Sequence, residues 1–257
     1  MVNNTNDYDR WCSMRKEYRG VNLKEVNNKK DLSDNLENIF KKFVQRICDN
    51  YDLDSGTKLA FWLNYWCHNY IPIERKFDYE SQLLRYKRGD IISLNLGFNV
   101  GSEQGGLHYA IVLNNINDKS NKVLTIIPLS THEKENKDEE DYLKYEVLID
   151  NSIFEEEVER LKNKLASFDT KLKDDKTSDD EKKKILKEIR ATQKELNKIS
   201  SEDKIYAQPA QVKTVSKLRI YYPTEVDDIL YGVNVGDTIM QEIEEKMMEL
   251  FFNKKDK

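Results

Sequence analysis

The chain has 257 residues, with 42 Lys and Arg against 47 Asp and Glu and a formal net charge of −5. Apolar residues make up 38% and charged residues 35%, enough for at least one core beside a large solvated helical part. This acidic balance excludes a protein coated in basic residues for bulk DNA binding, and it leaves room for a local basic groove.

The cysteines are Cys12, Cys48 and Cys67, an odd number without CxxC spacing. They indicate neither a disulfide framework nor a zinc site, and we expect no metal and no cofactor. No window approaches the ~20 apolar residues of a membrane span, and no apolar signal-peptide core is visible. We therefore expect a cytoplasmic protein that does not contact the membrane.

The first part of the chain, 1–86, is predicted to be a helical region. Apolar residues recur with the 3.6-residue period across 31–47, which indicates one buried helix face. Thr57 is predicted to cap the next helix, whose aromatic segment 59–66 is expected to be core rather than a base-stacking surface. Pro72 is expected to break or kink that helix.

From Lys87 the pattern changes to that of strands, with alternating or short apolar runs bounded by turn-forming residues. Stretches rich in Gly, Asn, Asp and Ser at 97–106 and 114–121 are predicted to be connecting loops. The four strands predicted in this part are 92–96, 109–113, 123–129 and 142–149.

A heptad rhythm follows at 153–172 and resumes at 185–199 after a polar turn. Ser178 and Glu181 form the pattern of a capping box at the start of the second helix. We predict an inserted antiparallel coiled-coil hairpin at 151–204, whose balanced charges indicate solvated faces and no binding role. Returning strands within 206–220, a short turn and an amphipathic helix at 237–252 complete the chain.

Three elements of the strand region occur in a fixed order. The segment Lys87–Asn115 reads KRGDIISLNLGFNVGSEQGGLHYAIVLNN, Thr125–Thr131 reads TIIPLST, and Gln211–Ile220 reads QVKTVSKLRI. Together they resemble the PemK/MazF toxins of type II toxin-antitoxin systems, which begin with RGD and an apolar strand followed by a GSEQGG-type loop.

The resemblance implies an α+β fold built on a small SH3-like β-barrel formed by 87–150 and 205–257. The N-terminal helical region, the inserted hairpin at 151–204 and the C-terminal helix then surround that barrel. It also implies a homodimer that acts as an endoribonuclease, cleaving single-stranded RNA (mRNA) without metal. An antitoxin protein would control it by lying across the same groove.

The candidate catalytic residues are His108, Ser130 and Thr131. His108 stands where many family members carry a catalytic Arg, and Tyr109 follows where Pro is common. Metal-free cleavage needs a base for the 2′-OH, an acid for the leaving oxygen and donors for the phosphorane; an imidazole with an unperturbed pKa near ~6.5 can do either proton transfer. One hydroxyl of Ser130 or Thr131 could donate to a phosphate oxygen, and the sequence leaves open which one aligns.

RNA contacts are expected from the glycine-rich loop, 97–106, and from two cations of the third element, Gln211–Ile220, which we call the late element. Glycines let the loop approach the RNA backbone, Glu103 and Gln104 either offer base-edge hydrogen bonds or brace the loop, and the cations meet phosphates. The predicted RNA-binding residues are Ser102, Glu103, Gln104, Gly105, Gly106, Lys213 and Arg219. Two alternatives remain: a catalytically inactive binding module for a peptide, RNA or protein partner, and a gyrase-directed poison that no residue specifically favours.

Overall fold

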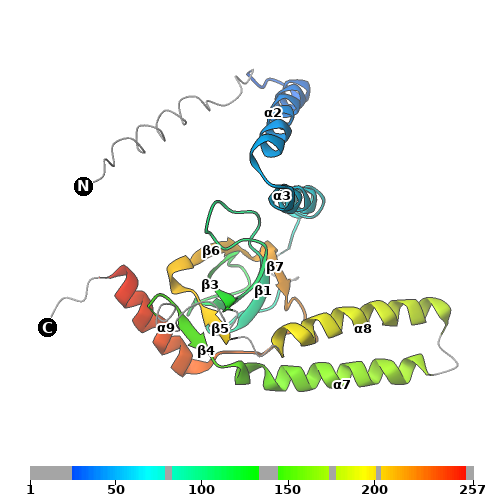
Figure 1. Ribbon diagram of the computed structural model, residues 1–257, viewed down its shortest axis with the longest axis vertical. Coiled ribbons are helices and arrows are strands. Elements are labelled where there is room, and N and C mark those ends of the chain that lie inside the picture. The colour runs from blue at the N-terminus through cyan, green and yellow to red at the C-terminus, as the bar shows by residue number, and fades with distance from the viewer. Residues whose placement is uncertain (1–24, 79–82, 133–143, 174–177, 201–203, 253–257) are drawn as a thin grey trace. The chain divides into compact units, whose positions relative to one another are not determined.

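The computed structural model describes residues 25–78, 83–132, 144–173, 178–200 and 204–252 (Figure 1). The chain divides into two compact units between Leu63 and Asn64. The second unit holds the sheet, the hairpin and the C-terminal helix. Across these described ranges, no helix is both long and apolar enough to cross a membrane.

The first predicted helix is confirmed as α2, Lys29–Asn50. The prediction that its apolar face is buried was wrong for the described residues, because Asn35 is the buried residue of α2 whereas Phe40 and Val44 are exposed. It begins where the Asn28 side chain accepts hydrogen bonds from the backbone N–H groups of Lys30 and Asp31, at 2.9 and 3.0 Å. This cap satisfies two of the N–H groups that a helix start leaves without an intrahelical partner.

The second helix, α3, spans Leu53–Tyr65, so it begins earlier than predicted. Asp52 precedes it, and its Oδ1 accepts a hydrogen bond from the backbone N–H of Ser55 at 2.9 Å. Asp52 therefore has the capping role, and the prediction of Thr57 as the cap was wrong because Thr57 lies inside the helix. Acidic side chains are also favoured at this end by the helix dipole.

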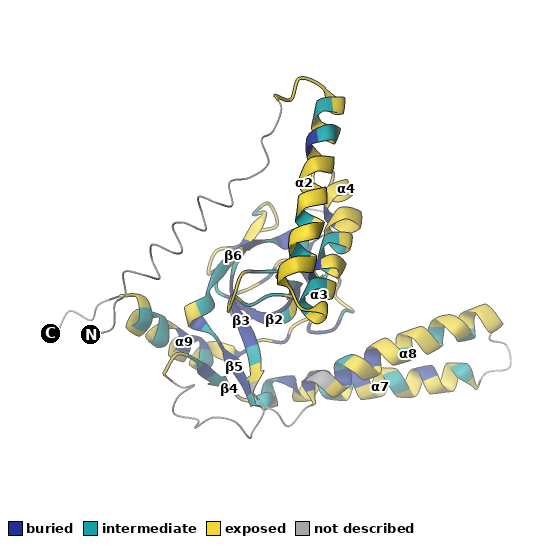
Figure 2. Cartoon of the chain, turned by 45° about the horizontal axis from the view of Figure 1, so that its top comes forward, coloured by how far each residue is buried: buried dark blue, intermediate teal, exposed yellow. Residues whose placement is uncertain are grey.

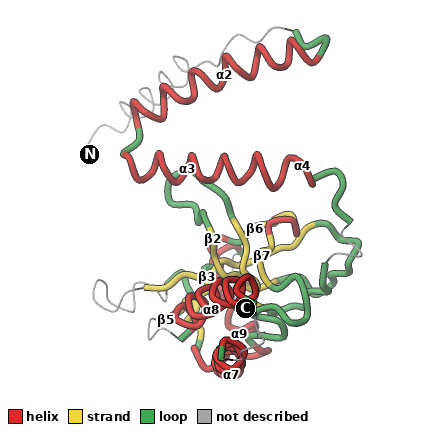
Figure 3. Tube along the Cα trace, turned by 90° about the vertical axis from the view of Figure 1, so that its right-hand side faces the viewer, coloured by secondary structure: helices red, strands yellow, loops and turns green. Residues whose placement is uncertain are grey.

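Pro72 does not break the helical path. The chain passes from α3 through a π-helical turn, Trp66–Tyr70, into the short α4, Ile71–Ile73, and Figure 3 shows one continuous rod. Proline lacks an N–H and its ring crowds the carbonyl four residues earlier, so a wider turn ahead of it relieves both problems. The aromatic segment is only partly core, because Leu59 is buried whereas Phe61 is 70% exposed.

The sheet is antiparallel throughout, in the order β4-β5-β3-β2-β1-β7, with β6 paired to β3 beside this path. The predicted mixture of helices and an antiparallel sheet is confirmed. Its strands are β1 (Ile91–Asn95), β2 (Leu107–Val112), β3 (Val123–His132), β4 (Val147–Ile149), β5 (Lys204–Ala207), β6 (Lys213–Ser216) and β7 (Ile220–Tyr222).

The expected barrel is not closed. Within the part of the chain that the structure describes, β4 pairs only with β5 and β7 pairs only with β1. The fourth predicted strand is also shorter than expected, since β4 begins at Val147; residue Tyr142 lies outside the described residues.

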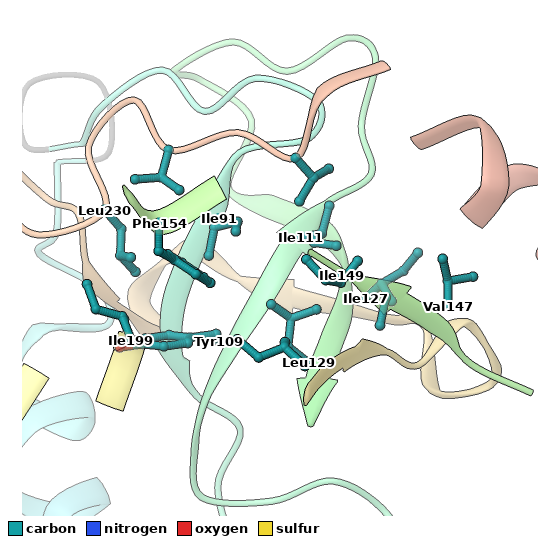
Figure 4. Packing of buried hydrophobic residues seen from close by; sticks show 14 of the residues in the cluster. Ile91, Tyr109, Ile111, Ile127, Leu129, Val147, Ile149, Phe154, Ile199 and Leu230 are labelled. Carbon is teal, nitrogen blue, oxygen red and sulfur yellow. The ribbon is translucent and has the colours of Figure 1, made fainter. Parts of the chain in front are cut away.

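Both faces of the central strands are buried. Ile91, Ile111 and Ile127 belong to one apolar cluster, whereas Leu94 and Ile126 belong to a second cluster on the opposite face. Side chains alternate between the faces of a strand, so burial on both sides requires a continuous apolar run. Figure 4 shows the first cluster, in which Tyr109 of β2 packs near residues from the hairpin.

The predicted hairpin is present as a 3₁₀ turn, Asn151–Phe154, followed by α7 (Glu155–Leu172) and α8 (Asp179–Ile199). The Ser178–Glu181 capping box is confirmed. Figure 2 shows buried residues of both helices near the sheet and exposed residues toward the far end. Four hairpin residues belong to the main core: Phe154, Leu161, Leu196 and Ile199.

The RGD motif is a structural corner. The Asp90 carboxylate accepts hydrogen bonds from the backbone N–H of Lys87 at 2.7 Å and from Asn234 Nδ2 at 2.9 Å. Arg88 donates to the carbonyl of Leu113 and to Glu244 of α9 (Gly236–Phe251). Gly89 has φ +83°, which strains other residues, and a Cβ there would lie 2.6 Å from Asn234 Oδ1 and displace the Asn234 side chain.

Candidate active site

His108 and Ser130 lie on the same face of adjoining strands. In the β2–β3 register Ala110 stands opposite Pro128, and continuing it by two residues places His108 opposite Ser130. His108 Nδ1 lies 3.3 Å from the carbonyl oxygen of Leu129, which agrees with that register. The structure thus brings two of the three predicted catalytic residues together.

The contact to Leu129 indicates the tautomer of His108. A carbonyl oxygen only accepts, so Nδ1 must carry the proton in this contact. In the neutral ring Nε2 then holds the lone pair and is the atom able to take a proton from a substrate hydroxyl.

The neighbouring hydroxyl, Thr131, lies on the other face. It follows Ser130 in β3, stands opposite Ile205 of β5 and is exposed. His132 ends β3 with its backbone opposite Lys204; its side chain lies outside the described part. Ser130 is therefore the hydroxyl that shares a face with His108.

Tyr206 extends the same row of side chains and was missed by the sequence reasoning. It stands opposite Ser130 in the β3–β5 register and is only 2% exposed. The signal was present in the two-residue alternation of KIYA, where Ile205 and Ala207 belong to the core of the opposite face. A row across four strands thus contains Leu94, His108, Ser130 and Tyr206.

The edge of β3 next to this row is irregular. Leu129 stands opposite Ala207 of β5, whereas Ile126 stands opposite Lys213 of β6. A step of three residues along β3 therefore corresponds to a step of six residues along the segment that joins β5 to β6. The extra residues include the 3₁₀ turn Pro209–Gln211, anchored where the Gln208 N–H donates to the Pro128 carbonyl at 2.9 Å. Side chains that a regular strand would place along the ladder are instead turned toward the glycine-rich loop.

The glycine-rich loop is closed at its neck and leaves no space there. The Gly106 N–H donates to the Gly97 carbonyl at 2.6 Å, and the Leu96 N–H donates to the Gly106 carbonyl at 2.7 Å. A Cβ on Gly105 would lie 2.8 Å from the Gly97 oxygen, so no other residue fits without moving the backbone. The GG pair of the motif therefore permits a close approach of two backbone segments.

Gln104 fastens this loop to the late element. Its N–H donates to Gln211 Oε1 at 2.8 Å, and its carbonyl accepts from Lys213 Nζ at 2.9 Å. Lys213 thus uses one of its three N–H donors to hold the loop. Gln208 and Gln211 belong to this arrangement although no sequence pattern singled them out.

Four predicted RNA-binding residues line one groove of ≈ 970 Å³ between the loop and the β6 segment. Ser102 and Glu103 come from the loop, and Lys213 and Arg219 come from the late element. Gln104, Gly105 and Gly106 do not line it, and neither do His108 and Ser130. Arg219 is held there by donating to the Asn95 carbonyl at 3.1 Å, and its guanidinium lies 6.0 Å from the centre of the Tyr70 ring.

Lys217 of the same element has a different role. Its side chain is fully buried, and Nζ donates to the Asp118 carbonyl at 2.7 Å. Burial lowers the pKa of this amine, because the charged form loses its hydration. Lys217 therefore holds the 114–121 loop and does not face the groove.

Metal ligands are not gathered at this site or elsewhere in the described ranges, where no group of three His, Cys, Asp or Glu could hold an ion. Cys48 and Cys67 are free and exposed. The polar side chains of the row across β2, β3 and β5 are those of His108, Ser130 and Tyr206.

Residues 87–173 match the model of the family described as PemK-like, MazF-like toxin of type II toxin-antitoxin system. This match supports the PemK/MazF toxin family for the part of the chain that contains β1 to β4 and α7. The late element at 211–220 lies outside the matched residues. Among curated proteins no match to the sequence was found.

Among solved structures, the chain is similar to the crystal structure of MazF (Form-I) from Deinococcus radiodurans, at 12% sequence identity and a TM-score of 0.33. The match covers 65% of this chain and 96% of that one.

Proposed function

We propose that this protein is a toxin of PemK/MazF type that cleaves single-stranded RNA without metal. The observation that carries the proposal is the placement of His108 and Ser130 on one face of β2 and β3, with Nδ1 of His108 at 3.3 Å from the Leu129 carbonyl. In the proposed organisation, 87–150 and 205–257 form the toxin domain, and 1–86 and 151–204 are additions.

In the proposed reaction the RNA 2′-oxygen attacks the adjacent phosphorus, and the bond from phosphorus to the 5′-oxygen breaks. His108 Nε2 accepts the proton of the 2′-OH, the 5′-oxygen takes a proton from water as it leaves, and the phosphate is left as a 2′,3′-cyclic ester. Ser130 donates a hydrogen bond to a non-bridging oxygen, where negative charge grows in the transition state. A histidine base at this position would replace the electrostatic role of the family Arg with a proton-transfer role.

The groove supports single-stranded RNA as the substrate class. Lys213 and Arg219 line it beside a loop whose polar groups can meet base edges. Its basic residues are local in a chain of net charge −5, which fits recognition of a short segment. Antitoxin control and a homodimer belong to the same proposal and rest on the family resemblance.

The test is incubation of the purified wild type with a long single-stranded RNA in EDTA, with the cut ends mapped. We expect cleavage by the wild type, loss of cleavage in His108→Ala, and a roughly 10²-fold slower reaction in Ser130→Ala. Thr131→Ala is the matched control, because it removes the adjacent hydroxyl from the opposite face and should leave the rate unchanged.

Two outcomes would contradict this function, and a third would contradict the assignment of Ser130. Cutting that requires added metal would exclude the proposed chemistry, and equal loss in Thr131→Ala and Ser130→Ala would exclude the assignment of the hydroxyl. Intact RNA with every variant would favour the catalytically inactive binding module.

A further inference from the structure

A chain of side-chain hydrogen bonds leads from the Glu146 carboxylate, directly before β4, to the glycine-rich loop. Gln208 Nε2 donates to Glu146 Oε1 at 2.8 Å, and Gln104 Nε2 donates to Gln208 Oε1 at 2.5 Å. All three side chains are half-buried, and they come from segments far apart in the sequence. We call Glu146, Gln208 and Gln104 the amide relay.

The direction of the relay is set at its carboxylate end. An ionised carboxylate only accepts hydrogen bonds, so Gln208 must turn its NH₂ toward Glu146 and its oxygen toward Gln104. Gln104 in turn must offer its NH₂ to Gln208, which directs its own Oε1 away from the relay. Glu146 thereby decides which of the two ends of the Gln104 amide is presented outward.

The Gln104 backbone is held as firmly as its side chain. Its N–H and carbonyl are bound by Gln211 and Lys213, and its carbonyl also accepts from Asn99 Nδ2. Within the described residues, Gln104 Oε1 accepts no hydrogen bond, and it is not among the buried unpaired atoms. An acceptor that reaches solvent on a fixed backbone is suited to reading a ligand, because little freedom is lost on binding.

The relay lies beside the candidate active site. Gln208 is two residues from Tyr206, which stands opposite Ser130, and Glu146 directly precedes Val147, the partner of Ala207. Successive residues on one face of a strand are about 6.6 Å apart, so the relay occupies the row next to His108 and Ser130. A base adjoining the phosphate at His108 is within reach of this row.

We infer that Glu146 and Gln208 are positioning residues that make Gln104 Oε1 a hydrogen-bond acceptor for the exocyclic amino group of a base. This inference deepens the proposed RNA-cleaving function by naming the bases selected. Adenine, guanine and cytosine all carry such an amino group on the pairing edge, which in cytosine is attached at C4. Uracil presents a carbonyl oxygen at the same position, and two acceptors facing each other repel.

The test measures binding apart from cleavage. Oligonucleotides of cytosine and of uracil, equal in length and carrying 2′-fluoro groups, keep the base edges but lack the attacking 2′-OH. We expect the wild type to bind the cytosine form roughly tenfold more tightly, the effect of one well-placed base contact. Gln104→Ala should bind both forms equally.

Two changes at Glu146 test the relay. Glu146→Gln can donate as well as accept, so it should remove the preference for cytosine. Glu146→Lys donates to Gln208, reverses every amide of the relay and should favour the uracil form. Glu188→Lys is the matched control, because it makes the same charge change on the exposed surface of α8 and should bind as the wild type does.

The outcomes separate this inference from the nuclease proposal. Wild type that binds both forms equally, binds neither, or keeps its preference after Glu146→Gln would overturn the inference. A cytosine preference that vanishes in Glu146→Gln, in a protein that leaves unmodified RNA intact, would support the relay and sink only the cleavage function. Far-ultraviolet circular dichroism of each variant checks that the fold is retained.

Discussion

The hydroxyl of Tyr109 donates a hydrogen bond to Glu195 Oε2 at 2.9 Å, which joins the central strand β2 to the second hairpin helix, α8. The Tyr109 ring also lies 6.3 Å, centre to centre, from the ring of Phe154 at the base of the first hairpin helix. The hairpin is therefore bound to the sheet by a polar contact and an aromatic contact at the same residue.

Tyr109 should make stability sensitive to alkaline pH. Burial, and then the nearby Glu195 carboxylate, raise the pKa of Tyr109 above its ordinary value of 10.0. Above pH 10 the unfolded chain loses this proton while the folded chain keeps it, so the free energy of unfolding falls as pH rises. The slope attributable to one such proton is at most about 1.4 kcal/mol per pH unit.

We expect Tyr109→Phe to unfold with a shallower dependence on pH above 10 than the wild type. At pH 7 it should lose about 1 kcal/mol, since Glu195 no longer receives its hydrogen bond. Urea denaturation at a series of pH values measures both quantities. If the free energy of unfolding of the variant depends on pH above 10 as steeply as that of the wild type, the Tyr109 hydroxyl is not the source of this dependence.

The base of the hairpin should be essential for the fold and its surface should not. Phe154 is fully buried in the main core, so Phe154→Ala should cost about 3–5 kcal/mol. Leu186→Ala, at a side chain that is 45% exposed on α8, should stay within about 0.5 kcal/mol of the wild type. Thermal unfolding of the two variants compares them directly. Equal effects would contradict the conclusion that the base of the hairpin shares one core with the sheet.

The stability of the RGD corner should depend more on Arg88 than on Glu244, the acid with which Arg88 forms an ion pair. Arg88 donates to the Leu113 carbonyl at 2.9 Å and to Glu244 at 2.6 Å, and its side chain is only 22% exposed. We expect Arg88→Ala to lose about 1–3 kcal/mol, because it leaves the Leu113 carbonyl without this donor. Glu244→Ala removes only a surface ion pair and should lose less than about 1 kcal/mol in urea denaturation. The opposite ranking would mean that the ion pair with Glu244, and not the hydrogen bond to the Leu113 carbonyl, stabilises the corner.

The neck of the glycine-rich loop should be sensitive to a single methyl group. Gly105→Ala places a Cβ 2.8 Å from the Gly97 oxygen, so the loop must shift and RNA affinity should fall at least tenfold. Gly101→Ala is the control, since nothing lies within 4 Å of its Cβ, although its φ of +60° costs about 1 kcal/mol of strain. Affinity measured by fluorescence anisotropy should separate the two; equal losses would indicate that backbone strain and not space decides the effect.

Much of the fold could be predicted because its elements carry local signals. The 3.6-residue period of 31–47, the heptads and the Ser178–Glu181 box each depend on residues close in sequence, and the structure shows these helices. Helix starts were less certain, since Asp52 and Thr57 are both residues that can cap a helix and only the backbone path separates them.

The site was harder to predict because it depends on register. The sequence named both Ser130 and Thr131, and only the pairing of β3 with β2 distinguishes the two faces. Gln208, Gln211 and Glu146 were missed because the offset between β3 and its neighbouring strands, which turns them toward the loop, leaves no periodic trace. Sheet closure likewise depends on strand ends and not on patterning, so the open sheet was not foreseen.

The hairpin lies between two strands that pair with each other. Ile149 of β4 stands opposite Ile205 of β5, although the whole of α7 and α8 separates them along the chain. Joining distant segments normally costs loop-closure entropy, and contacts far apart in sequence slow folding. The two helices are adjacent in sequence, so they can pair with each other first. Their pairing brings the end of α8 back beside the start of α7, and therefore β5 beside β4. The hairpin thus shortens the effective loop between these two strands and speeds the assembly of that edge of the sheet.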